Sequence, residues 1–261
     1  MHRSCSFLLS LVMSFFLLLV SDARAVETVV PDGPSLIVEV DTLLNREKVY
    51  TKNKMIVTAS SGSQRAFVYE SWGRDYNAKT LLRYSAPARI KGQAVLMLNN
   101  ADDIWMYFTR TGRIRKLASH SKRRRMEGSD FSYEDIGGGN TFVSDFSASL
   151  EGEHLLAGSL CYRLRLERKP DSDSSYEMLM IWIRKADSYP LVIEYYKDKS
   201  VGRPDKRLTL SDIIMVQGVP TAQYLRMQNN NEQSTTVIEI QAVDYMADIG
   251  KERFTVKALD K

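Results

Sequence analysis

Apolar and polar residues alternate along most of this chain, with the period of two that is typical of half-buried β-strands. In "RAFVYESW", Ala66, Val68, Glu70 and Trp72 share one face. Similar stretches, separated by short polar turns such as Ser61-Gly62, predict roughly ten or eleven strands. Because no helical pattern comes between them, we predict one antiparallel meander without a linker between domains.

One segment near the N-terminus follows a different period. In "SLIVEVDTLLNREKVY", which begins at Ser35, apolar residues recur at spacings of three and four, as in an amphipathic helix. Pro34 and Ser35 precede them as a helix-start signal. The predicted fold class is therefore mainly β with some helix (α+β). A sheet this long curls, and its apolar concave face needs a cover. The N-terminal helix is one candidate, and residues 119–140 are the other.

The second candidate cover contains "RRRMEGSDFSYEDIGGGN", residues 123–140. We interpret residues 119–140 as a movable helical lid, with Met126 and Phe131 as apolar plugs over a cavity. Ser129 or Ser132 would cap a short helix through "FSYEDI", and three glycines from 137 to 139 would form a hinge. The alternative is a rigid connector in which Phe131 is permanent core.

Residues 1–25 have the pattern of a cleaved export signal, and we do not expect them to be part of the folded domain. Arg3 precedes an apolar run that is too short to span a bilayer, and Ala23-Arg24-Ala25 fits a cleavage site. We therefore predict a periplasmic protein whose mature domain covers residues 26–261 and begins at Val26.

Charge and cysteine content limit the possible functions. The formal net charge is +4, and it falls to +3 once residues 1–25 are removed. This near-neutral balance gives no indication of nucleic-acid binding. The mature chain keeps one cysteine, Cys161, so no intramolecular disulfide can form and the core alone must hold the fold.

Several stretches together resemble the outer-membrane lipoprotein-sorting proteins, the LolA-like periplasmic carriers. They are "LLRYSAPARIKGQAVL", "IWMYFTRTGRIRKL", "MEGSDFSYEDI" and, in the C-terminal half, "YPLVIEYYKD", "LTLSDI", "GVPTAQYLRM" and "TTVIEI". The resemblance implies an incomplete, curled antiparallel β-barrel of the LolA/LolB type, capped by helices around a hydrophobic cavity. It also implies a monomeric carrier that takes lipoprotein or lipid acyl chains from an inner-membrane transporter.

An enzyme is the less favoured interpretation. The sequence has no HExxH, CxxC or GxSxG motif, and the mature chain has two histidines, His120 and His154. A Cys-His dyad would need Cys161 beside His154, and a buried, inert cysteine is the simpler reading. We predict no cofactor and no metal.

The candidate ligand-binding residues are large, deformable or aromatic side chains, which suit an acyl-chain cavity. Each of them could equally be ordinary core. They are Trp72, Trp105, Tyr107, Met126, Phe131, Met178, Met180 and Trp182.

The run Lys122, Arg123, Arg124 and Arg125 could contact anionic headgroups during a transient membrane encounter, or an acidic partner surface; a solvated loop is the alternative. A second hypothesis for the whole protein is an accessory or sensor that docks on a transporter or signalling protein without carrying cargo.

Overall fold

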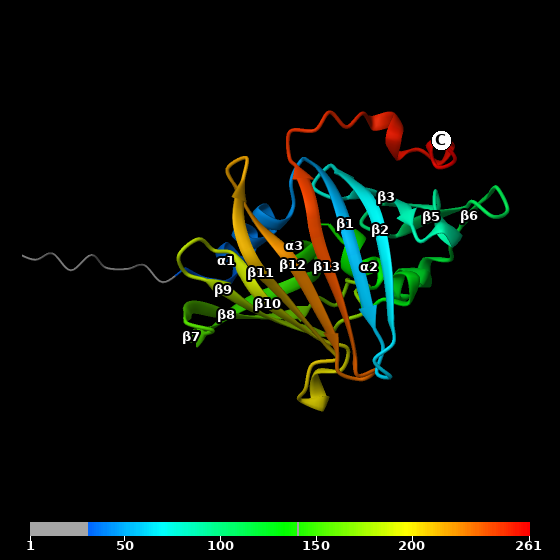
Figure 1. The fold of residues 1–261 in the computed structure, drawn as a ribbon. Coiled ribbons are helices and arrows are strands. Elements are labelled where there is room, and N and C mark those ends of the chain that lie inside the picture. The colour runs from blue at the N-terminus through cyan, green and yellow to red at the C-terminus, as the bar shows by residue number, and fades with distance from the viewer. Residues whose placement is uncertain (1–30, 140) are drawn as a thin grey trace, which may run out of the picture. The chain divides into compact units, whose positions relative to one another are not determined.

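The computed structural model describes residues 31–139 and 141–261, and within them thirteen strands form one antiparallel sheet (Figure 1). The predicted export signal lies outside the described residues. The strands are β1 (Lys48–Thr58), β2 (Gln64–Arg74), β3 (Lys79–Ala86), β4 (Ala94–Leu98), β5 (Asp103–Phe108), β6 (Arg113–Lys116), β7 (Phe146–Leu156), β8 (Ser159–Arg168), β9 (Met178–Arg184), β10 (Pro190–Tyr196), β11 (Lys206–Val216), β12 (Val219–Asn229) and β13 (Ser234–Asp244).

The strand order differs from a simple meander at one place. It runs β6-β5-β4-β3-β2-β1-β13-β12-β11-β10-β9-β8-β7, so the first and last strands pair in the middle of the sheet. The two edges of the sheet are β6 and β7, which follow each other in the chain. The curled, incomplete barrel is thus confirmed, and its opening lies where the chain passes from β6 to β7.

The predicted strand number was too low, and β7 is the strand that the pattern did not reveal. Its apolar alternation covers only Phe146, Ala148 and Leu150, because the register with β8 shifts between Leu150 and Gly152. Such an irregularity breaks the period of two on which sequence recognition of a strand depends.

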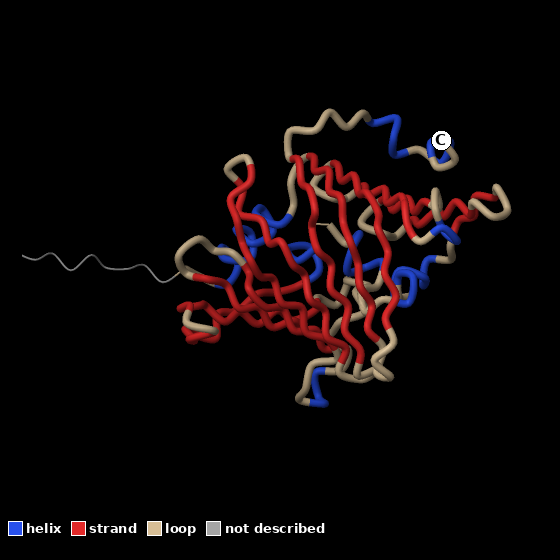
Figure 2. The backbone as a smooth tube through the Cα atoms, viewed as in Figure 1, coloured by secondary structure: helices blue, strands red, loops and turns tan. Residues whose placement is uncertain are grey.

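The α-helices lie on one side of the sheet (Figure 2). The N-terminal helix is confirmed as α1 (Gly33–Leu44), although its cap is Asp32, whose side chain accepts a hydrogen bond from the Ser35 N–H at 2.7 Å. The other helices are α2 (Tyr133–Gly137), α3 (Thr141–Asp145) and the short 3₁₀ turns η1 (Ala88–Ile90), η2 (Ser119–Arg123), η3 (Met126–Gly128), η4 (Lys199–Val201), η5 (Lys251–Phe254) and η6 (Val256–Ala258). No helix in the described ranges is long and apolar enough to cross a membrane.

The main core lies on the concave face, beneath the helices. Leu36, Ile37 and Val40 of α1 belong to this core together with inward-facing strand residues such as Phe67 and Leu82, all of them almost fully buried. Because burial of apolar surface is the dominant stabilising contribution, this helix-covered face holds the fold together.

The opposite, convex face is also apolar over β1 to β5, and the C-terminal segment covers it. Ile249, Phe254 and Leu259 are buried there against Leu81 and Leu96.

Backbone oxygens of this C-terminal segment are held by two strand arginines. Arg74 Nη1 donates to the Ile249 oxygen at 2.6 Å, and Arg83 Nη2 donates to the oxygens of Ala258 and Leu259. The segment therefore serves as a fixed outer cover of the sheet.

Removing this cover should expose the convex face. A chain that ends at Met246 leaves Trp72, Trp105 and Leu81 without their partners, and exposed apolar patches of this kind promote association. We expect the truncated protein to unfold at a lower temperature and to form oligomers in size-exclusion chromatography. An unchanged melting temperature and elution volume would contradict this function of the C-terminal segment.

Candidate functional site

The concave face contains an apolar cavity of about 240 Å³. Its walls come from the C-terminal half of α1, from α2 and from strands of both halves of the sheet. The apolar lining includes Leu44, Tyr69, Leu82, Ile136, Tyr189, Leu210, Leu225 and Ile238. A concave apolar site with a few polar groups is the usual form of a small-molecule site in proteins.

The polar side chains that line this cavity are neutral, apart from one arginine. Burial raises the pKa of Tyr69, and it raises the pKa of Tyr189 to about 12, so both phenols stay uncharged at neutral pH. Arg46 lines the cavity, and its Nε atom is buried with no hydrogen-bond partner within the described protein. The cavity therefore combines an apolar body with one cationic group.

Residues 119–139, here called the crossing segment, lead from the β6 edge toward the β7 edge over the concave face. Met126 is fully buried and Phe131 is 2% exposed, and both belong to the main core. The two residues also pair through their backbones, because the Met126 N–H donates to the Phe131 oxygen at 2.8 Å. The tip of this segment is thus a tight turn inserted into the core.

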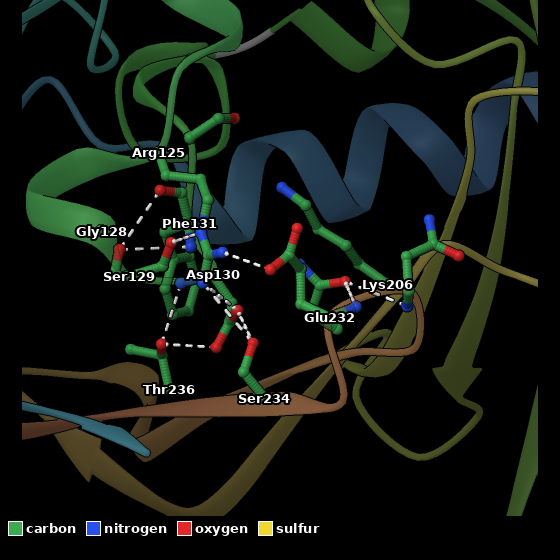
Figure 3. Close-up of polar contacts among 12 residues, drawn as sticks. Arg125, Gly128, Ser129, Asp130, Phe131, Lys206, Glu232, Ser234 and Thr236 are labelled. Carbon is green, nitrogen blue, oxygen red and sulfur yellow. Dashed lines mark hydrogen bonds and ion pairs between the residues drawn. The ribbon is translucent and has the colours of Figure 1, made fainter. Parts of the chain in front are cut away.

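Asp130 fixes the tip of the crossing segment to β13 (Figure 3). Its fully buried carboxylate accepts hydrogen bonds from Ser234 Oγ and Thr236 Oγ1, and it lies 2.8 Å from Arg125 Nη2. The Asp130 N–H also donates to Thr236 Oγ1 at 2.9 Å. Buried charges need such compensation, and here it comes from both the segment and the sheet.

A second buried ion pair fixes α2. Lys206 Nζ of β11 lies 2.8 Å from Asp135 Oδ2, and the two side chains are 7% and 1% exposed. Tyr176 also donates to Asp135, at 2.7 Å. Asp135 and Ser132 form the capping box of α2, which confirms Ser132 as the predicted cap. These contacts support the rigid-connector alternative over a movable lid.

Six of the predicted cavity residues lie on the other face of the sheet. In β5, Ile104 and Met106 point into the main core, so the alternate residues Trp105 and Tyr107 belong to the outer cluster under the C-terminal segment, as does Trp72.

In β9, Met178, Met180 and Trp182 form a separate outer cluster with Tyr196. None of these six residues lines the concave cavity, and ligand binding by them stays a prediction. Both faces of the sheet are apolar, and the alternation alone does not tell which one is concave.

The basic run is only partly available for an anionic ligand. Lys122 is buried, and its Nζ lies 2.8 Å from Asp102 and 2.6 Å from Asp173, while Arg125 is paired with Asp130. Arg123 donates to the backbone oxygen of Asp173. The charges of Lys122 and Arg125 are thus already compensated by carboxylates of the same chain, and headgroup contact by the basic run stays a prediction. Arg124 is exposed.

His154 and Cys161 are direct partners in the β7–β8 ladder. Cys161 is fully buried, and burial raises the pKa of its thiol. A nucleophilic cysteine needs the opposite shift. In the described part of the chain, no group of three His, Cys, Asp or Glu side chains is placed to hold a metal ion.

Sequence reasoning missed most of the cavity lining, which includes Tyr69, Leu82, Tyr189, Leu225 and Ile238. Each of them lies at an inward position within a predicted strand or next to one. The alternation of apolar and polar residues therefore indicated part of the lining. Choosing the correct face required the position of α1 relative to the sheet.

Comparisons with known proteins agree with this geometry. A family model described as "Uncharacterized protein" matches residues 76–261. None of the curated proteins matches the sequence.

Three solved structures superimpose closely on this one. A DUF1329 family protein from Desulfovibrio piger has 25% identity and a TM-score of 0.79, over 87% of this chain and 97% of that chain. A domain assigned to an outer membrane lipoprotein-sorting protein from Vibrio parahaemolyticus has 20% identity and a TM-score of 0.78, over 88% and 98%. A LolA superfamily protein from Nitrosomonas europaea has 18% identity and a TM-score of 0.73, over 87% and 99%. The chain belongs to the matched family, because the family model covers well over half of the chain, and the chain has the fold of the LolA superfamily.

Proposed function

We propose that this protein is a periplasmic carrier that holds the acyl chains of a lipoprotein or another lipid in the concave cavity. The observation that carries the proposal is the apolar cavity between α1, α2 and the sheet, in a fold shared with a lipoprotein-sorting domain. Arg46 Nε, which has no hydrogen-bond partner among the described residues, would meet a carbonyl oxygen of the cargo at one end.

The cavity must enlarge to accept a whole acyl chain. Its volume of about 240 Å³ lies below the roughly 300–1,000 Å³ of ordinary ligand sites. The crossing segment is held by two buried ion pairs, whereas α1 makes no ion pair among the described residues and contributes mainly Leu36, Ile37 and Val40 to the core. We therefore propose α1, rather than the crossing segment, as the element that moves when cargo enters.

Filling the cavity tests where the ligand binds. Leu225→Trp places a larger side chain into the lining, so the affinity for the uncharged fluorophore N-phenylnaphthylamine should fall about tenfold or more. Tyr224→Trp is the matched control, since Tyr224 directly precedes Leu225 in β12 and is 38% exposed. Fluorescence titration gives both affinities. Equal probe binding in the two variants would place the ligand elsewhere.

Cargo itself is tested by native mass spectrometry of protein prepared without detergent. We expect a monomer carrying lipid-sized adducts that Leu225→Trp removes. In this proposal the protein works beside an inner-membrane transporter, and crosslinking in cells should join the two. Protein that is free of lipid and recovered from the cytoplasm would contradict the carrier function.

A further inference from the structure

A second cleft, separate from the apolar cavity, lies near the β6 edge of the sheet and has a volume of about 450 Å³. Three arginines line it from three different elements: Arg89 from η1, Arg110 from the β5–β6 turn and Arg115 from β6. The register pairs Arg115 with Met106, so Arg115 stands on the same concave face as the main core.

The charge of this cleft is not compensated within the described residues. Arg89, Arg110 and Arg115 make no ion pair there, whereas arginines elsewhere on the sheet, such as Arg184 and Arg207, each have a carboxylate partner. In the part of the chain that the structure describes, no acidic residue lines the cleft. Convergent like charges raise the local potential and attract a ligand of opposite sign.

An acidic residue does line the adjoining pocket. It is Glu127, and its carboxylate accepts a hydrogen bond from Gln93 Nε2 at 2.7 Å. Arg124 and Arg125 line that pocket as well, so it holds charges of both signs, whereas the charged residues that line the cleft itself are all cationic.

The remaining lining indicates the class of ligand. Thr109 adds a hydroxyl group beside the guanidinium groups, while the Thr111 hydroxyl donates to the Phe108 backbone oxygen. Guanidinium groups match phosphate oxygens through paired hydrogen bonds. Phe108 lines this cleft and also the adjoining pocket, whose apolar residues include Leu117 and Tyr133. A ligand that satisfies both surfaces has a phosphate at one end and an apolar body at the other.

The cleft also borders the core beneath the helices. The Arg89 guanidinium carbon lies 5.8 Å from the ring centre of Phe67, which is fully buried in the main core. We infer that the arginine cleft, lined by Arg89, Arg110 and Arg115, binds the phosphate headgroup of an amphiphilic ligand. This inference rests on the proposed carrier function, and it assigns the headgroup to a site other than the predicted basic run.

The test compares two ligands that have the same acyl chain. Calorimetric titration at physiological salt uses myristoyl lysophosphatidic acid, monomyristoylglycerol, and inorganic phosphate alone. We expect the unmodified protein to bind lysophosphatidic acid about tenfold more tightly than the monoglyceride. In the triple variant Arg89→Gln, Arg110→Gln, Arg115→Gln, that preference should disappear while the affinity for the monoglyceride stays unchanged.

The matched control removes the same charge elsewhere. Lys197, Arg203 and Arg226 are exposed and make no ion pair among the described residues, so their triple change to glutamine should keep the preference. An equal loss in this control, or full preference in the cleft variant, would overturn the inference. Inorganic phosphate bound as tightly as the amphiphile would also overturn it, in favour of a free-phosphate site. Arginine-dependent binding of lysophosphatidic acid with no monoglyceride binding would support the cleft and overturn the carrier function.

Discussion

Replacing Phe131 with alanine should lower the free energy of unfolding by about 3–5 kcal/mol, the usual effect of removing a fully buried aromatic ring. Phe131 is 2% exposed and packs in the main core at the tip of the crossing segment. Its neighbours Asp130 and Ser132 are held by hydrogen bonds, so the segment cannot easily collapse into the space that the ring leaves. Urea unfolding followed by tryptophan fluorescence measures the loss.

The same variant distinguishes a rigid connector from a lid. If Phe131 is a core residue, its replacement lowers stability and leaves the exchange rate of bound N-phenylnaphthylamine unaltered. If Phe131 is a plug over the cavity, its replacement speeds that exchange and costs little stability. Phe142→Ala is the control, because Phe142 is only partly buried at the edge of the same core. Faster exchange with a stability loss no larger than in this control would restore the lid hypothesis.

Lys206→Met should be about as damaging, with a loss of about 3–5 kcal/mol, because it leaves the Asp135 carboxylate buried without its partner cation. Asp135 is 1% exposed, so water cannot replace the ammonium group. The double variant Lys206→Met, Asp135→Asn should recover part of that loss, since asparagine removes the charge and can still accept a hydrogen bond from Tyr176.

An exposed ion pair supplies the comparison for Lys206. Lys79 is paired with Asp75, and both side chains are more than one third exposed. Lys79→Met should change stability by about 1 kcal/mol or less, as is usual for surface pairs. Similar losses in Lys206→Met and Lys79→Met would mean that the buried pair holds α2 no more firmly than a surface contact.

The general architecture could be predicted because its signals are local. The spacing of Leu36, Ile37 and Val40 indicates a helix whatever surrounds it, and the alternation in β2 or β5 likewise indicates a strand. The resemblance to lipoprotein-sorting proteins added the curled, incomplete barrel, which the comparisons with solved structures confirm.

The site could be predicted only in part, because its residues depend on contacts between distant positions. Trp105 and Met106 are neighbours in the chain, and only the packing of α1 shows that Met106 faces the concave core. In the same way, Lys122 belongs to a basic run in the sequence, but Asp102 and Asp173 compensate its charge in the fold. A large aromatic side chain or a local charge does not by itself indicate a ligand.

The pairing of β1 with β13 has a consequence for how the chain folds. Strands β1 to β6 and β7 to β13 are each built from hairpins between consecutive strands, whereas Lys54 of β1 lies opposite Glu239 of β13. Such a long-range pairing has a larger loop-closure entropy to overcome than a hairpin has, and topologies that are rich in long-range pairings fold slowly. We therefore expect the two half-sheets to form first and to join last. Until the two half-sheets join, β1 and β13 are unpaired edge strands, to which another chain could add a strand.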